Sequence, residues 1–164
     1  MTNAKTAAEC CPKFDPEPWQ EKELIWKDKL FIKETVPQFM QIPLPGTFGK
    51  AVGRMWQKIE DARAEPEMKD FIMLSTESSP WKGEVYITTT KEVPNAKNVK
   101  FSGTYLTKVF DGPYNDVPKW IKEMTPYVAA KGKSVKKWFF YYTTCPKCAK
   151  KYGKNYVAVV AQVE

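Results

Sequence analysis

The sequence predicts a single α+β domain that is built from two similar halves. Two observations favour this fold class: the order strand, helix, strand, strand occurs twice along the chain, and in each half a glycine ends an apolar strand just before an aromatic residue leads into the helix. The chain has 164 residues, which suits one domain, and 43% of them are hydrophobic. That share is ample for one packed core.

Residues 1–24 are predicted to form an extended arm. Three prolines interrupt this stretch and exclude a helix. Its aromatic residues, Phe14 and Trp19, favour packing of the arm on the domain, which we expect over residues 25–164.

The first half covers about residues 30–92. Its first strand, residues 30–44, is rich in β-branched and aromatic side chains, and Pro37 indicates an edge position or a bulge. Thr47 is a plausible N-cap for the helix that follows, whose apolar residues recur at helical spacing. Two further strands are expected at residues 71–74 and 84–90.

The second half covers about residues 99–164 and begins with a strand at residues 99–110. Asp116 can cap the next helix, Pro126 should kink or shorten it, and Gly132 should end it. The last two strands are expected at residues 138–142 and 156–163.

A Gly-Pro-Tyr turn at residues 112–114, between an apolar strand and a Trp-bearing helix, resembles the GyrI-like small-molecule-binding family. The resemblance implies an antiparallel sheet with both helices on one face and a ligand groove between the halves, lined by aromatic residues and often an acidic one. Members of that family include effector domains of multidrug-responsive regulators, proteins that sequester toxic compounds, and hydrolases that open reactive cyclopropane-bearing compounds.

Aromatic side chains are the main candidates for ligand binding. Residues 138–142 are all aromatic, so both faces of this strand carry rings. One face should meet the helices, and the other either lines a pocket or is covered by the arm with Phe14 and Trp19. Rings of this kind favour planar, hydrophobic and cationic ligands. The candidate ligand-binding residues are Trp81, Tyr86, Tyr105, Trp138, Phe140 and Tyr142.

Acid-base chemistry in this chain has to use residues other than histidine, because the sequence contains none. Histidine triads, His-ligated zinc hydrolysis and His-ligated haem are therefore excluded. Glu84 is the nearest substitute for the acid of the family's groove, with exposure on a strand surface as the alternative. As catalytic residues we expect Glu84, activating water or protonating a leaving group, and Tyr142 or Tyr105, orienting the electrophile.

The four cysteines raise a separate question. Cys145 and Cys148 have the spacing of a zinc or redox pair, and Cys10 and Cys11 could supply two more thiolates. A structural zinc site, a disulfide or redox role, and free thiols all remain open. The alternative function is a metal-stabilised interaction module that these four cysteines organise. The leading hypothesis requires no cofactor.

The leading hypothesis is a protein that binds small hydrophobic, aromatic or cationic molecules for sequestration or detoxification, with hydrolysis of reactive compounds as an extension. The formal net charge of +7 is spread over scattered lysines without a nucleic-acid-binding motif, so we do not expect nucleic acid as a partner. No apolar run is long enough for a membrane span or a signal peptide. We therefore expect a cytoplasmic monomer or weak dimer.

Overall fold

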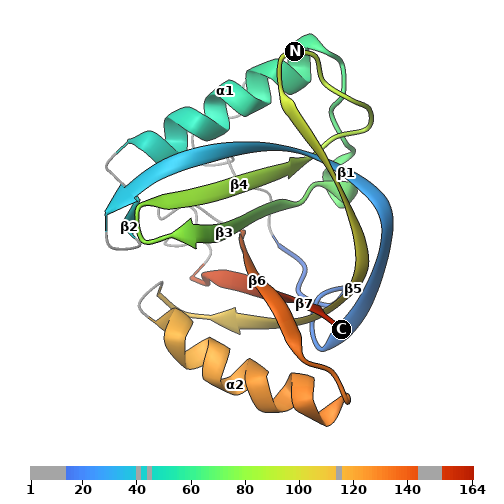
Figure 1. Ribbon diagram of the computed structural model, residues 1–164, viewed down its shortest axis with the longest axis vertical. Helices are drawn as coiled ribbons and strands as arrows, with labels where there is room; N and C mark the ends of the chain where they lie inside the picture. Colours follow the sequence, from blue (N-terminus) through green and yellow to red (C-terminus); the bar gives the residue numbers. More distant parts are fainter. Residues whose placement is uncertain (1–13, 40–41, 44–45, 114–115, 144–152) are drawn as a thin grey trace. The chain divides into compact units, whose positions relative to one another are not determined.

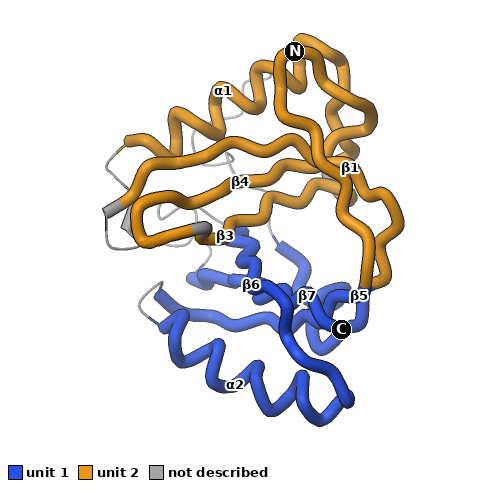
Figure 2. Tube along the Cα trace, viewed as in Figure 1, with its two compact units in different colours: residues 1–24, 104–164 blue, residues 25–103 orange. Residues whose placement is uncertain are grey.

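The computed structural model describes residues 14–39, 42–43, 46–113, 116–143 and 153–164 (Figure 1). The chain divides into two compact units, which Figure 2 colours separately: residues 1–24 with 104–164 form unit 1, and residues 25–103 form unit 2. Among the described residues there are seven strands and two α-helices. None of the described helices is long and apolar enough to span a membrane.

Unit 2 contains an antiparallel sheet and one α-helix. The strand β4 pairs with β1 on one side and with β3 on the other, so it lies at the centre of this sheet. The elements are β1 (Lys22–Phe39), which starts in unit 1, β2 (Ile42–Pro43), α1 (Thr47–Asp61), the short 3-10 helix η2 (Met68–Asp70), β3 (Met73–Ser79), β4 (Lys82–Thr88) and the first part of β5 (Lys97–Asp111).

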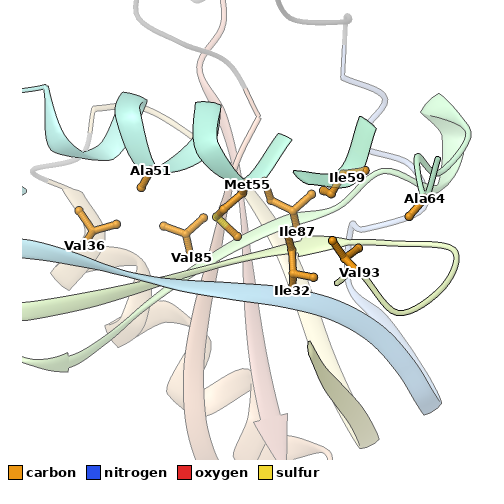
Figure 3. Packing of buried hydrophobic residues seen from close by; sticks show 9 residues of the cluster. All are labelled: Ile32, Val36, Ala51, Met55, Ile59, Ala64, Val85, Ile87 and Val93. Atoms are coloured by element: carbon orange, nitrogen blue, oxygen red, sulfur yellow. The ribbon is translucent and has the colours of Figure 1, made fainter. Parts of the chain in front are cut away.

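Helix α1 covers one face of this sheet. Its buried residues, Ala51, Met55 and Ile59, recur every four positions and so lie on one side of the helix. They pack against buried strand residues, as Figure 3 shows. The buried cluster consists of Ile32, Val36, Ala51, Met55, Ile59, Ala64, Val85, Ile87 and Val93.

Unit 1 has its own sheet and its own helix. The strand β7 (Tyr156–Val163) pairs antiparallel with the second part of β5 and with β6 (Val135–Tyr142). Residues 157–161 of β7 are fully buried, as expected for an uninterrupted apolar run at the centre of a sheet. Helix α2 (Val117–Ala130) buries Trp120, Met124 and Val128 in a second cluster against these strands.

The predicted fold class is wrong in its architecture. The strand β5, at one end of the hydrogen-bonded strand order, also pairs with β1 near the other end, so the pairing closes on itself instead of leaving an open α+β sheet. The two helices also do not share one face of one sheet, because α1 packs in the cluster of unit 2 and α2 packs in that of unit 1. In the described part of the chain, strand residues outnumber helical ones.

The physical reason for the closed pairing is the length of β1 and β5, which have 18 and 15 residues. The strand β1 is long enough to pair with both β4 and β5, and β5 is long enough to pair with both β7 and β1. Asp28 in β1 and Gly103 in β5 both have positive φ, 52° and 132°, a backbone state that locally bends a strand. Near this bend the Asp28 N–H donates to the Ser102 hydroxyl at 2.8 Å.

Several boundaries differ from those predicted. The first strand starts at Lys22 rather than at residue 30, and the second strand of the first half occupies Met73–Ser79 rather than residues 71–74. Thr47 is the first helical residue and not the cap: Gly46 precedes it with φ 77°, and the Thr47 hydroxyl donates to the Pro37 carbonyl at 3.5 Å.

The second helix follows its prediction more closely. It ends as expected before Gly132, whose φ of 72° stops the helix. Asp116 is at the N-cap position but makes no capping hydrogen bond with its side chain. Pro126 lies inside the helix, which still runs to Ala130, so this proline does not shorten it.

Replacement of Met55 by alanine should destabilise the protein by about 2–5 kcal/mol, because the Met55 side chain is 1% exposed and its removal leaves a cavity between α1 and the strands. Urea denaturation followed by circular dichroism measures the change. Lys50→Ala, on the exposed side of the same helix, should change the free energy of unfolding by less than about 0.5 kcal/mol. Equal effects of the two changes would contradict this packing.

Candidate functional site

The face of the unit 2 sheet opposite α1 carries the candidate site. Because side chains alternate along a strand, Val85 and Ile87 point to α1 while Glu84 and Tyr86 lie on the other face. Cross-strand pairing with β1 places Thr35 opposite Glu84 and Lys33 opposite Tyr86. These four polar side chains therefore share one face.

Glu84 has a close contact at each carboxylate oxygen. The Tyr86 hydroxyl donates to Oε1 at 2.7 Å, and the Lys33 ammonium lies 2.8 Å from Oε2. The side chains of Lys33 and Glu84 are only 19% and 11% exposed. The Lys33 Nζ also lies 5.9 Å from the centre of the Tyr86 ring. Glu84, Tyr86 and Lys33 form a compact group, which we call the Glu84 site.

Tyr86 is held in its protonated form at this site. Burial of the hydroxyl raises its pKa well above the ordinary value, and the hydrogen bond to Glu84 and the negative charge of that carboxylate raise it further. The hydroxyl therefore remains a hydrogen-bond donor throughout the physiological pH range.

Aromatic rings continue the Glu84 site along the same unit. The Tyr86 ring lies 5.0 Å from that of Phe101, which in turn lies 4.8 Å from the Phe31 ring and is stacked on Trp26 at 6.4 Å. Phe31 is fully buried and Tyr86 is 4% exposed, whereas Thr35, beside Glu84, is exposed. The Glu84 carboxylate thus lies between a ring cluster and a position that water reaches.

This arrangement combines three chemical capacities. The carboxylate of Glu84 can accept a proton, the Lys33 ammonium can stabilise negative charge, and the half-buried Phe101 and Trp26 rings offer apolar surface for stacking. Glu84 and Tyr86 are among the residues predicted from the sequence, whereas Lys33, Phe31, Phe101 and Trp26 are not. The available signal was the position of Lys33 directly after the apolar residues Leu30, Phe31 and Ile32 of a strand.

Three of the predicted ligand-binding residues lie in unit 1 on the side of α2. Trp138, Phe140 and Tyr142 alternate along β6 and pack with Trp120 and Met124 of the helix. The Phe140 and Tyr142 rings stack with their centres 6.2 Å apart. Tyr142 thus lies in the packing cluster of α2, and Tyr86 is the tyrosine at hydrogen-bonding distance from Glu84.

The opposite face of the unit 1 sheet carries Tyr141, over which the N-terminal segment lies. The ring centres of Phe14 and Trp19 are 5.7 and 5.4 Å from that of Tyr141. The buried Thr107 hydroxyl donates to the Trp19 carbonyl at 2.6 Å, which fixes this segment to β5. Burial raises the pKa of Tyr141 to about 12.

Two of the remaining predicted residues are placed as follows. Tyr105 is 1% exposed on β5 in unit 1, and burial raises its pKa. Trp81 is 53% exposed in the turn between β3 and β4.

The four cysteines, Cys10, Cys11, Cys145 and Cys148, lie outside the described residues. Within the described part of the chain no group of acidic or thiol side chains could hold a metal ion. The zinc hypothesis therefore stays a prediction from the sequence.

Tyr141 should make the protein less stable at high pH. Its pKa is about 12 in the folded protein and about 10 when unfolded, so its contribution is fully present below pH 10 and is lost as pH rises through 12. Tyr141→Phe removes this contribution. Between pH 10 and 12 the free energy of unfolding of the wild type should fall by about 2 kcal/mol more than that of the variant. Denaturation at a series of pH values measures this difference. If the free energy of unfolding falls equally in the wild type and in Tyr141→Phe over this range, the burial of this hydroxyl is contradicted.

Solved structures with the same fold have low sequence identity to this chain. The EcmrR C-terminal domain is 12% identical with a TM-score of 0.66, over 89% of this chain and 98% of that one. A hydrolase from Listeria innocua is 14% identical with a TM-score of 0.66, over 88% of this chain and 92% of that one. These matches are in keeping with a GyrI-like fold, although none of them names that family.

A third match is EcmrR in a complex with DNA, which is 13% identical with a TM-score of 0.63, over 87% of this chain and 56% of that one. The expectation that nucleic acid is not a partner therefore has no support from these structures.

Family membership comes from the sequence as a whole. No curated protein matches the chain. A family model described as bacterial hydrolase matches residues 1–163, almost the full length. The chain therefore belongs to the bacterial hydrolase family.

Proposed function

We propose that this protein is a GyrI-like hydrolase that binds small hydrophobic or aromatic molecules at the Glu84 site and opens a reactive, strained group in them, with detoxification as its role. The observation that carries the proposal is the largely buried Glu84 carboxylate, held at 2.7 Å by Tyr86 and at 2.8 Å by Lys33 beside a ring cluster. Membership of the bacterial hydrolase family supports the reaction class.

In the proposed reaction Glu84 acts as the general base. The Tyr86 hydroxyl and the Lys33 ammonium hold one carboxylate oxygen each and so fix the position of the group that accepts the proton. Glu84 takes a proton from a water molecule while the water oxygen forms a bond to a carbon of a three-membered ring. The strained bond between that carbon and a neighbouring ring atom breaks, and its electron pair goes to the neighbouring atom. That atom then takes the proton from the Glu84 carboxyl, which returns to its carboxylate form.

Opening a strained ring needs little activation, so the few polar groups of the Glu84 site can be sufficient for it. A strained ring releases energy on opening, so it needs less activation than an amide bond. One positioned general base contributes about 10²–10⁴-fold in rate. Phe101 and Trp26, the half-buried rings of the cluster, supply apolar and stacking contacts for an aromatic substrate beside Tyr86.

Glu84→Gln should abolish hydrolysis while leaving ligand binding largely intact, because glutamine keeps the shape of the side chain and cannot accept the proton. The test uses an aryl-substituted, electronically activated cyclopropane and follows ring opening by mass spectrometry in ¹⁸O-labelled water. We expect the rate to fall by about 10²–10⁴-fold.

Glu34→Gln is the matched control for this experiment. Glu34 lies on β1 as well, but on the α1 side, where it pairs with Arg54, so its loss should leave the rate unchanged. Ring opening at the wild-type rate in Glu84→Gln would refute the general-base role. Saturable binding of the compound without any ring opening would refute hydrolysis and leave sequestration.

A further inference from the structure

We infer that Lys33 sets the ligand specificity of the Glu84 site, so that it selects neutral aromatic molecules over cationic ones. This inference rests on the proposed binding function and narrows its substrate class. The cationic ligands expected from the sequence would enter a site in which the chain has placed a cation of its own.

The first observation is the ion pair between Lys33 and Glu84. The ammonium lies 2.8 Å from Oε2, and both side chains are mostly buried. A carboxylate attracts a cationic ligand most strongly when its charge is uncompensated. Here a ligand cation would have to displace the ammonium or bind next to it, and like charges at such short range repel each other strongly in a partly buried place.

The second observation is the position of the same ammonium relative to the Tyr86 ring. At 5.9 Å from the ring centre, Lys33 is within the range of a cation–π contact. A carboxylate and a ring face are the two groups that attract aromatic cations into protein sites. Here both already interact with the Lys33 ammonium. A neutral aromatic ligand can stack on the half-buried Phe101 and Trp26 rings without competing for either.

Backbone pairing fixes Lys33 in this place. It lies directly opposite Tyr86 in the antiparallel pair of β1 and β4, with regular pairing from Phe31 to Pro37. Its neighbours in sequence, Ile32 and Glu34, point to the α1 side. The side chain therefore emerges on the Glu84 face whatever ligand is present.

The test compares acridine with N-methylacridinium, two rings of nearly equal size and shape, in mildly alkaline buffer where acridine is neutral. Binding to the wild type, to Lys33→Met and to Lys50→Met is followed by the fluorescence of each probe. Lys50→Met removes the same charge from an exposed position of α1 and is the matched control. Circular dichroism confirms that each variant is folded.

The wild type and Lys50→Met should bind acridine about tenfold more tightly than N-methylacridinium, a difference of about 1.4 kcal/mol. Lys33→Met should reverse this preference, because the Glu84 carboxylate then loses the ammonium at 2.8 Å. Glu84→Gln, which leaves the ammonium and removes the carboxylate, should enlarge the preference for acridine and tests the same point if Lys33→Met does not fold.

Two results would overturn the inference while leaving the proposed binding in place: tighter binding of N-methylacridinium by the wild type, or the same ratio in wild type and Lys33→Met. Failure of the wild type to bind either probe would instead refute aromatic ligand binding itself.

Discussion

The two-residue alternation of β4 is the constraint on which the Glu84 site depends. Val85 and Ile87 are 1% and 0% exposed against α1, so a shift of this strand by one residue would turn them away from the helix and place the Glu84 carboxylate against Met55. The hydrophobic cluster of unit 2 thus determines which face carries Glu84 and Tyr86. The same core that stabilises this sheet positions the polar residues on its other side.

The electrostatics of the site also follow from burial. Charged side chains that are 19% and 11% exposed are tolerated because they are paired, and removal of either one takes this pairing from the other. A buried ion pair is often no more stabilising than apolar residues of the same volume. Its presence beside a ring cluster is therefore in keeping with a role in ligand chemistry rather than in stability.

The sequence predicted the parts of the fold that depend on local patterns. The apolar spacing in α1, the run of buried residues in β7 and the glycine that ends α2 are each visible within a short stretch of chain. The closed strand pairing was not predictable in this way, because it depends on contacts between β1 and β5, about 75 residues apart in the sequence. The position of Asp28 and Ser102 in that bend becomes apparent only once the two strands are paired.

The candidate site was predictable in part for the same reason. Glu84 and Tyr86 are neighbours on one face of a single strand, so their proximity follows from alternation. Lys33 comes from another strand, and its place depends on the register between β1 and β4, which no local pattern reveals. The aromatic run of β6 attracted attention because it is dense in sequence, yet the helix packing of α2 occupies one of its faces.

The most direct test of ligand binding at the Glu84 site is an NMR titration with acridine of protein labelled with ¹³C in its tyrosine and phenylalanine rings. We expect saturable shifts of the Tyr86, Phe31 and Phe101 resonances, with Phe140 and Tyr142, which pack against α2, unchanged. Saturable shifts confined to Phe140 and Tyr142, with Tyr86 unaffected, would contradict binding at the Glu84 site.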